Sequence, residues 1–309
     1  MSDLIWLNGE YVKRNEAKIS LYESGLLYGY GVFETIMINK RRAFQLTAHY
    51  DRLKNSAKHI RMPVHISQKS LDKVISRLAQ INSIEKGYLR MVISSSEEPM
   101  KSMRFSSSVE EPKKNLDETG SYQTSMMLVE TGPISPDYEK FRQSGVSVAL
   151  YPARRSADTA YYRHKTLAYM ENLITRRWAF KHKALEAIFT NTNDNIMEGT
   201  RSSFFIVKDH KVFTPSIESN ILPGVTRGVV MNLCTKNAIK VREGLMTRED
   251  ILAADEAFLT STLMEIMPVT NCKIENKNGE MDTKVIKKGE VGPVTRVLQT
   301  AYRDLLDMS

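Results

Sequence analysis

The order of apolar and polar residues predicts that the chain opens with short antiparallel strands. Residues 5–12 place Asn8 and Gly9 between apolar side chains, and this arrangement is typical of a β-hairpin. The apolar run that follows Gly31 indicates a buried strand. Two more apolar runs predict strands over residues 87–93 and 123–130.

Apolar residues three and four positions apart predict two helices among these strands. Thr47 should cap the first helix, whose core stripe leaves His49 and Arg52 off the core face. That stripe consists of Leu53, Ala57 and Ile60. The second helix spans about residues 69–80. The first part of the chain therefore combines helices with antiparallel strands.

Another amphipathic helix is predicted in the second half of the chain, directly after Lys165. Its apolar residues recur at steps of three and four, namely Leu167, Met170, Ile174 and Trp178. This spacing indicates a helix docked on a core, with Lys165 at its start. Other patterns predict a strand over 146–150 and helices that begin near Pro223 and Pro293.

Lys165 is a candidate nucleophile because aromatic residues surround it in the sequence. Tyr161, Tyr162 and Tyr169 are close, and partial removal from water would lower the pKa of the Lys165 amine toward the neutral, reactive form. The alternative is a solvated lysine that extends past the end of a helix.

Glu198 is the second candidate, because Glu198 and Gly199 lie between the apolar runs 187–189 and 204–207. This order predicts a tight connection between two strands, from which a carboxylate can point into a cleft. The alternative is a solvated glutamate in an ordinary turn.

Composition narrows the class of protein. The 309 residues are 41% apolar, enough for one large or two modest domains. The net charge of +8 is scattered rather than gathered into a stripe, which argues against nucleic-acid binding. Cys234 and Cys272 have no metal-site spacing, and neither a signal peptide nor a membrane-spanning run is visible. We therefore expect a soluble cytoplasmic protein with no metal site and no membrane contact.

Two segments indicate how the domains are organised. Residues 131–137 are rich in proline, glycine and serine, so we place a boundary there and expect domains over 1–134 and 135–309, the second carrying Lys165. Residues 94–121 are polar and poor in aromatic side chains, which predicts a long surface loop or flexible insertion.

Several blocks resemble the signatures of the class IV, fold type IV aminotransferases. They are His164-Lys165-Thr166-Leu167 with Tyr169 and Asn172, Glu198-Gly199-Thr200, and Leu222-Pro223-Gly224-Val225-Thr226-Arg227. The match runs in the same order from Asn8-Gly9 to Gly292-Pro293 and leaves out only residues 94–121. This family contains branched-chain and D-amino-acid aminotransferases and aminodeoxychorismate lyase, all dependent on pyridoxal 5'-phosphate (PLP).

The resemblance implies an α+β fold, in which PLP binds between a small α/β domain and a larger, barrel-like α/β domain, and it implies a homodimer. Lys165 would bind PLP covalently and move the substrate proton, Glu198 would keep the pyridine nitrogen protonated, and Tyr169 would lie near the ring hydroxyl. The residues implied to hold the phosphate are Arg52, Val225, Thr226 and Thr262.

Residues on the substrate side are also carried over from the resemblance. They are Tyr28, Phe33, Tyr88 and Arg90. Tyr88-Leu89-Arg90 resembles the Tyr-x-Arg by which branched-chain aminotransferases hold the substrate carboxylate, and strand alternation would place Tyr88 and Arg90 on one face. However, lyases and D-amino-acid enzymes commonly carry an arginine where this chain has Ser94-Ser95-Ser96, and many relatives have asparagine at Ser203.

These features predict an aminotransferase that acts on a hydrophobic, branched-chain-like amino acid and a 2-oxo acid such as 2-oxoglutarate. The L-form of the amino acid is preferred, but the sequence leaves the enantiomer open. Aminodeoxychorismate lyase and D-amino-acid aminotransferase remain alternatives, because they share the proton abstraction that Lys165 and Glu198 serve. A non-catalytic PLP-binding module is the alternative from another class.

Overall fold

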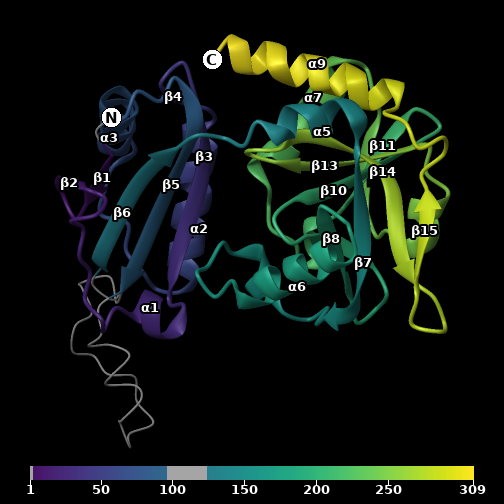
Figure 1. The fold of residues 1–309 in the computed structure, drawn as a ribbon, viewed down its shortest axis with the longest axis horizontal. Helices are drawn as coiled ribbons and strands as arrows, with labels where there is room; N and C mark the ends of the chain where they lie inside the picture. The colour runs from purple at the N-terminus through teal and green to yellow at the C-terminus, as the bar shows by residue number, and fades with distance from the viewer. Residues whose placement is uncertain (1–2, 96–123) are drawn as a thin grey trace, which may run out of the picture. The chain divides into compact units, whose positions relative to one another are not determined.

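The computed structural model describes residues 3–95 and 124–309 (Figure 1). The predicted polar insertion therefore lies outside the described residues from position 96 onward. Contacts divide the chain into two compact units, the first comprising Met1–Ile134, His164–Tyr169 and Ser309, and the second Ser135–Arg163 and Met170–Met308. The segment with Lys165, which sequence placed in the C-terminal domain, thus packs with the first unit.

The first unit is built on an antiparallel sheet of six strands. They are β1 (Leu4–Leu7), β2 (Glu10–Lys13), β3 (Gly31–Asn39), β4 (Arg42–Ala43), β5 (Lys86–Ser95) and β6 (Thr124–Gly132). The order across the sheet is β2-β1-β6-β5-β3-β4, and the long strands β6, β5 and β3 lie side by side in its middle (Figure 1). Asn8 and Gly9 both have positive φ angles between β1 and β2, which confirms the predicted hairpin.

Two helices provide the core of this unit. α2 (Leu46–His59) and α3 (Gln68–Ile81) pack buried apolar side chains against one face of the sheet, and the short α1 (Ser24–Tyr28) precedes β3. Ile36 of β3 and Met91 of β5 are fully buried members of that core. Both helices were predicted from their apolar spacing.

Two predicted details of α2 are wrong. The N-cap is Gln45, in a left-handed conformation, and Thr47 instead accepts a hydrogen bond from Gln68. His49 and Arg52 are buried rather than exposed, because both pair with a carboxylate on β3. Apolar periodicity could not reveal this, since it assigns polar residues to the solvent side of a helix.

The second unit contains a mixed, curled sheet of nine strands (Figure 1). They are β7 (Val146–Arg155), β8 (Glu186–Asn191), β9 (Ile196–Gly199), β10 (Ser203–Lys208), β11 (Lys211–Pro215), β12 (Val241–Gly244), β13 (Glu256–Ser261), β14 (Glu265–Glu275) and β15 (Met281–Val285). The order is β12-β11-β10-β13-β14-β7-β8-β9, and β15 pairs with β14. The α+β class is therefore confirmed.

The helices of the second unit connect and cover these strands. They are α5 (Asp137–Ser144), α6 (Met170–Lys181), α7 (Val225–Lys236), α8 (Arg248–Leu252) and α9 (Pro293–Asp307), with 3-10 turns at Ala160–Arg163 and Ile217–Ser219. α9 begins at the proline that the sequence indicated, and α8 begins with a capping box formed by Thr247 and Asp250.

The predicted core face of α6 is wrong. The helix begins at Met170, and its buried residues are Thr175 and Ala179. Met170 and Ile174, which the periodicity assigned to the core, are 72% and 55% exposed. The error arose because the series began at Leu167, which lies outside the helix and packs near Phe33 in the first unit.

The described residues contain neither a membrane-spanning helix nor a metal-binding group of side chains. Within 3–95 and 124–309, no helix has the length and apolarity needed to cross a membrane. In the same ranges, no group of three or more His, Cys, Asp and Glu side chains is arranged to hold a metal ion. Cys234 and Cys272 are buried free thiols.

A buried carboxylate fixes the start of the last helix. Glu256 of β13 accepts hydrogen bonds from the backbone N–H groups of Val294 and Thr295 at 3.0 and 2.8 Å, and from the Thr295 hydroxyl at 2.7 Å. These N–H groups have no partner inside the helix, and the helix dipole favours a negative charge at this end. Glu256 therefore ties α9 to the sheet.

We predict that Glu256→Gln lowers the free energy of unfolding by about 1.5 to 3 kcal/mol, because it removes a charged acceptor from buried donors. Urea denaturation followed by circular dichroism measures this loss. Glu290→Gln is the matched control, since Glu290 is exposed and should change stability by less than about 0.5 kcal/mol. Equal stabilities of the two variants would show that Glu256 does not anchor α9.

Candidate functional site

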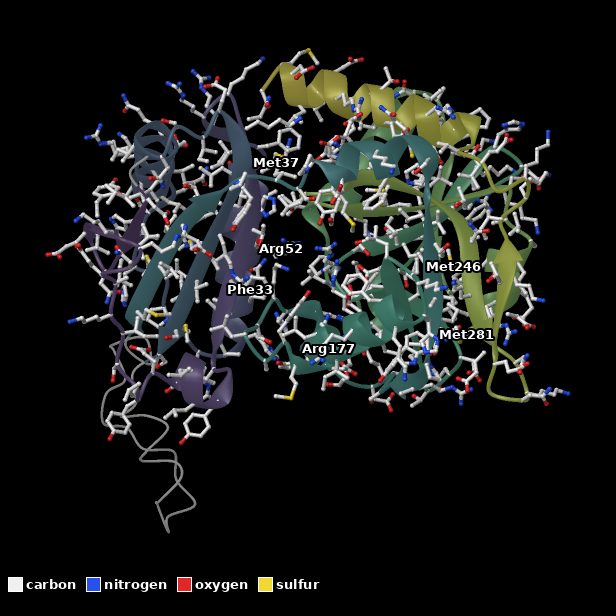
Figure 2. All side chains as sticks on the ribbon, in the orientation of Figure 1. Phe33, Met37, Arg52, Arg177, Met246 and Met281 are labelled. Carbon is white, nitrogen blue, oxygen red and sulfur yellow. The ribbon has the colours of Figure 1, made fainter. Side chains whose placement is uncertain are left out.

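Phe33 is the centre of the predicted site residues in the first unit. It extends from β3, as does Met37 further along the strand (Figure 2). The Lys165 amine lies 4.3 Å from the centre of the Phe33 ring, and the Arg90 guanidinium lies 4.8 Å from it. The Tyr169 ring meets Phe33 edge-on at 5.5 Å between centres. Three predicted residues from two distant segments of the chain therefore gather around one aromatic ring.

The backbone of the lysine segment is fixed to the start of β3. Phe33 donates its N–H to the Lys165 carbonyl at 3.1 Å, and Leu167 donates to the Gly31 carbonyl at 2.8 Å. The Lys165 N–H in turn donates to the Ser56 hydroxyl of α2 at 3.1 Å. These bonds make the segment an extension of the sheet, so Lys165 has a defined position without belonging to a helix.

The residues of β5 lie where strand alternation predicts. Tyr88 and Arg90 share a face, while Leu89 and Met91 are buried on the other. Tyr88 covers Gly132 of β6, where a Cβ atom would come within 2.7 Å of the tyrosine ring. Arg90 is exposed although it contacts the Phe33 ring, so a substrate carboxylate can reach its guanidinium from solvent.

Ser94 occupies a position that has little room for a larger side chain. It is fully buried, and its hydroxyl donates to the Glu23 carboxylate at 2.5 Å. A Cβ atom on Gly25 would lie only 2.7 Å from the Ser94 Cβ. A much larger side chain at this position would collide with this packing.

The predicted substrate residue Tyr28 lies at the surface of the first unit. It ends α1 and is 43% exposed. Gly29, which follows it, adopts a left-handed conformation with φ of 67° and lies close to Ala168, so that a Cβ atom there would meet the Ala168 backbone at 3.0 Å. Glycine is therefore required where the helix turns into β3.

Arg52, predicted to hold a phosphate, is already held by a buried carboxylate. Its Nε and Nη2 atoms both donate to Glu34 of β3 at 2.7 Å, and the His49 ring contacts the same carboxylate at 2.8 Å. A guanidinium has five N–H donors, so this pair orients the group while engaging only part of it.

The charges of this cluster follow from burial and pairing. Burial would raise the pKa of Glu34, but the Arg52 guanidinium and then His49 outweigh burial and hold it below its usual range. Burial also lowers the pKa of His49, which the hydrogen bond to Glu34 only partly offsets. The cluster is therefore a Glu34–Arg52 ion pair beside a neutral imidazole near pH 7.

Glu198 is held on both carboxylate oxygens in the second unit. It lies at the end of β9 with a side chain that is 10% exposed. Arg155, the last residue of β7, donates to Oε1 at 3.2 Å, and the Leu222 N–H donates to Oε2 at 3.0 Å. A carboxylate so bound is fixed in direction, which suits the role predicted for it.

The turn after Glu198 is anchored by another carboxylate. Glu186 of β8 is fully buried and accepts hydrogen bonds from the Thr200 N–H at 3.1 Å and the Ser202 hydroxyl at 3.0 Å. A Cβ atom on Gly199 would fall 2.2 Å from the Ser202 hydroxyl, so only glycine fits between them. Packing around the turn therefore requires glycine at position 199, and the bond to Glu186 fixes Thr200, in addition to any role of this sequence as a family motif.

The start of α7 has the features of an anion site. Its N-cap is Gly224, which provides no side-chain cap, so the first backbone N–H groups point out of the helix. A Cβ atom on Gly224 would lie 2.7 Å from the Ser203 hydroxyl, and Ser203 pairs across the strands with Thr260. The Thr260 hydroxyl is buried with no hydrogen-bond partner in the described part of the chain.

The remaining phosphate candidates lie in the same unit. Val225 and Thr226 are the first two residues of α7. The side chain of Thr226 forms a hydrogen bond with Tyr302, so a phosphate here would be bound by the backbone N–H of Thr226. Thr262 is half-buried in the turn between β13 and β14. The structure thus places Glu198, Val225, Thr226 and Thr262 in the second unit and the other predicted site residues in the first.

Sequence reasoning missed two residues of these clusters. In the sequence, Arg155 is one of the scattered basic residues and gave no reason to expect a role in the site. Glu34 lies within the apolar run that predicted a buried strand, and it was not singled out. A charge inside an otherwise apolar run was the available signal for Glu34. Arg155 had no local signal, because its partner Glu198 is 43 positions away.

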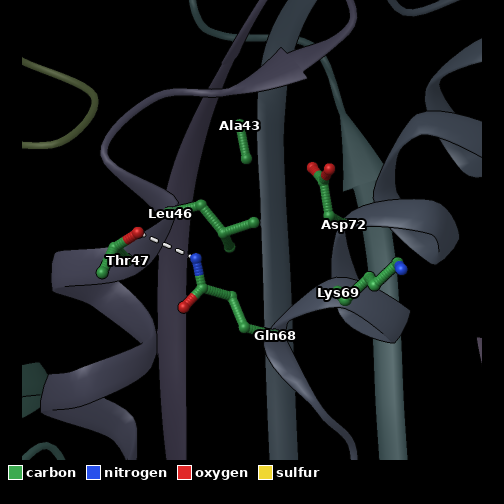
Figure 3. A pocket seen from close by; sticks show the side chains of 6 residues that line it. All are labelled: Ala43, Leu46, Thr47, Gln68, Lys69 and Asp72. Carbon is green, nitrogen blue, oxygen red and sulfur yellow. Dashed lines mark hydrogen bonds between the residues drawn. The ribbon is translucent and has the colours of Figure 1, made fainter.

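A surface hollow of about 570 Å³ in the first unit contains none of the predicted site residues. It is lined by Ala43, Leu46, Thr47, Gln68, Lys69 and Asp72 (Figure 3). The hydrogen bond from Gln68 to Thr47 crosses one side of it (Figure 3). Its lining has neither a buried charge nor an unpartnered buried group in the described ranges, so we assign it no chemistry.

Comparison with known families gives a match over most of the chain. The model of the amino-transferase class IV family matches residues 31–272. A candidate branched-chain-amino-acid aminotransferase of Methanocaldococcus jannaschii is 30% identical over 97% of this chain and 96% of its own length. A D-alanine aminotransferase of Bacillus licheniformis is 29% identical over the same shares of the two chains. An aminodeoxychorismate lyase of Bacillus subtilis is 26% identical over 97% and 94%.

Solved structures agree with this result. The branched-chain amino acid aminotransferase of Escherichia coli has a TM-score of 0.83 and 28% identity, covering 99% of this chain and 95% of its own. That of Thermus thermophilus, solved with pyridoxamine 5'-phosphate, has a TM-score of 0.81 and 25% identity over 99% and 94%. Structural similarity therefore includes a relative that binds a form of the expected cofactor.

We predict that Glu34→Gln lowers the free energy of unfolding by about 3 to 5 kcal/mol at pH 7, because it leaves Arg52 buried without a counter-charge. Since the folded-state pKa of Glu34 is lowered, its contribution is present above the unfolded value of about 4.3 and disappears as the pH falls below it. The deficit of the variant relative to wild type should therefore shrink in acid.

Urea denaturation at a series of pH values measures this difference. Glu85→Gln is the control, because the Glu85–Arg41 pair is exposed and should contribute less than about 1 kcal/mol at any pH. A Glu34→Gln deficit that did not depend on pH would contradict the ion-pair account.

Proposed function

Since the chain belongs to the class IV aminotransferase family, we propose that it is a PLP-dependent enzyme that transfers an amino group between a branched-chain-like L-amino acid and a 2-oxo acid such as 2-oxoglutarate. The observation that carries this proposal is the cluster of Lys165, Arg90 and Tyr169 around Phe33. It combines an amine, a carboxylate-binding cation and an apolar surface, which are the groups that such a substrate requires.

The residues present fit PLP. The uncapped start of α7 and the unpartnered Thr260 hydroxyl suit its phosphate, together with the backbone of Val225 and Thr226, and Thr262 and Arg52 are the further candidates. Glu198, with both oxygens already held, suits the pyridine nitrogen. When bound, PLP supplies an electron sink for the pair released from the substrate Cα–H bond.

Lys165 would act first as the covalent attachment point and then as the proton carrier. The backbone of Lys165 is held by hydrogen bonds with the Phe33 N–H and the Ser56 hydroxyl. The amine can therefore move by rotation of the lysine side chain while the Cα atom stays in place. The Phe33 ring covers one side of the amine and limits where its nitrogen can move.

Substrate recognition would combine a cation with an apolar wall. Arg90 would hold the substrate carboxylate through the paired donors of its guanidinium. Phe33 and Tyr88 would face the hydrophobic side chain, and Tyr28 would border it from α1. This selection favours branched-chain-like amino acids over small or acidic ones.

Two catalytic alternatives share the same chemistry at Lys165 and Glu198. The D-alanine aminotransferase and aminodeoxychorismate lyase relatives are similar over nearly the whole chain, so only substrate-facing residues discriminate among the activities. Ser94, packed against Gly25, removes one arginine position and favours recognition through Arg90. A non-catalytic PLP-binding module would bind the cofactor but convert no amino acid.

A homodimer is part of the proposal. It is supported by the family resemblance and by the exposed apolar side chains Leu26, Leu27 and Tyr28 of α1, which a second subunit would cover. Light scattering that found a fully active monomer would rule it out.

We predict that borohydride reduction attaches PLP irreversibly to wild-type protein through Lys165. Peptide mass spectrometry should find the added mass on the peptide that contains Lys165, and Lys165→Ala should show none. Lys181→Ala is the control, because Lys181 ends α6 and is exposed. The same reducible attachment in Lys165→Ala would refute the assignment.

We predict that Arg90→Ala raises the KM for L-leucine about tenfold, the equivalent of about 1.4 kcal/mol of lost carboxylate binding. Lys86→Ala, at the exposed start of β5, should leave the KM unchanged. An unchanged KM in Arg90→Ala would move carboxylate binding to another residue, for example Arg201.

The substrate is best decided by single-turnover reactions with L-leucine, D-leucine, D-alanine, L-glutamate and aminodeoxychorismate. We expect L-leucine and L-glutamate to convert the cofactor to its pyridoxamine form. Release of pyruvate and 4-aminobenzoate from aminodeoxychorismate, without reaction of the leucines, would make the protein a lyase. No reaction with any of the five would favour the binding module.

A further inference from the structure

Arg155 is a buried cation for which the proposed function has so far no role. Its side chain is only 1% exposed, and it lies against two aromatic rings, with its guanidinium carbon 3.4 Å from the centre of Phe189 and 4.2 Å from that of Tyr162. The packing and the low exposure together keep water away from the guanidinium. A cation in such a position strongly affects any charge that it contacts.

Three acceptors take up the donors of Arg155. Nη1 donates to Glu198 at 3.2 Å, Nε to Glu171 at 3.0 Å and Nη2 to Asn172 at 3.1 Å. Glu171 and Asn172 belong to the first turn of α6, and Asn172 also donates to the Thr200 carbonyl at 2.6 Å. Arg155 therefore joins α6 to the turn that carries Glu198.

The two carboxylates on Arg155 are not equivalent. The Glu171 side chain is 45% exposed, so water already stabilises its charge, whereas the Glu198 side chain is 10% exposed. Glu198 also accepts a hydrogen bond from the Leu222 N–H, but this donor is neutral and cannot replace a cation. A buried carboxylate that loses its cation tends to take up a proton instead.

We propose that Arg155 is a positioning residue that keeps Glu198 in its carboxylate form and thereby keeps the shared proton on the ring nitrogen of bound PLP. This inference rests on the proposed function, in which Glu198 faces that nitrogen. One proton is shared by the nitrogen and the carboxylate. With Arg155 in place the proton stays on nitrogen, and without Arg155 it moves to an oxygen of Glu198, so the pair neither gains nor loses a proton.

The location of the proton matters because only a protonated ring withdraws electrons strongly. The guanidinium contacts the Glu198 carboxylate directly, with Nη1 3.2 Å from Oε1. Arg155 therefore stabilises the negative charge on Glu198 more than it opposes a positive charge on the ring. The alternative is a purely structural role, in which Arg155 only fastens α6 to the turn after β9.

Nuclear magnetic resonance of holoenzyme reconstituted with ring-¹⁵N-labelled PLP distinguishes these roles, because protonated and neutral pyridine nitrogens give well-separated signals. We expect the protonated signal in wild type and in Arg155→Lys, which keeps the charge. In Arg155→Met we expect that signal to be lost and the neutral one to appear. Arg154→Met is the matched control, since Arg154 pairs with Asp194 at the surface and should give the wild-type signal.

Retention of the protonated signal in Arg155→Met would overturn the inference and leave the residue a structural role. Glu198→Gln tests the proposed function separately: if it also retains the protonated signal, Glu198 is not the partner of the ring nitrogen. If Arg155→Met does not fold, ¹³C-carboxyl resonances of glutamate in the wild-type holoenzyme decide, with Glu198 identified by its absence in Glu198→Gln. A Glu198 carboxyl that titrates between about pH 6 and 8 beside intact Arg155 would equally overturn the inference.

Discussion

A charge that is buried in a protein must be paired, and this constraint determines how both units present their polar residues. In the first unit Arg52 is bound to Glu34, and in the second Arg155 is bound to Glu198. In each pair the carboxylate comes from a strand of the central sheet. The arginines are therefore positioned by the most rigid part of each unit, before any ligand binds.

Lys165 and Glu198, the two groups proposed to take part in catalysis, also depend on the sheets for their positions. Lys165 obtains its position from backbone bonds to β3 and from a hydroxyl of α2, although its own segment is irregular. Glu198 obtains its direction from Arg155 and Leu222, and its turn is held by Glu186. A flexible amine on a fixed backbone and a fixed carboxylate are the combination that proton transfer at a bound cofactor requires.

Family membership and substrate choice depend on different parts of the molecule. Three of the residues that would bind PLP, Arg52, Glu198 and Thr226, are buried, so substitutions there would also disturb folding. Arg90 and Tyr28 are exposed, and Tyr88 is partly so, which leaves them free to vary without loss of the fold. This difference explains why chains with three different activities can be similar over nearly their whole length.

The sequence by itself determined the features that depend on neighbouring residues: the Asn8-Gly9 hairpin, the helices over α2, α3 and α9, and the ordered blocks that identify the family. It could not determine which polar residues are buried, because burial depends on partners distant in the chain. Only the tertiary structure shows that Arg155 pairs with Glu198 and Arg52 with Glu34. It also shows that Met170 is exposed, although the apolar periodicity predicted that it would be buried. Local patterns report the preferences of a segment, whereas the cost of removing a charge from water is decided by whatever the fold places beside it.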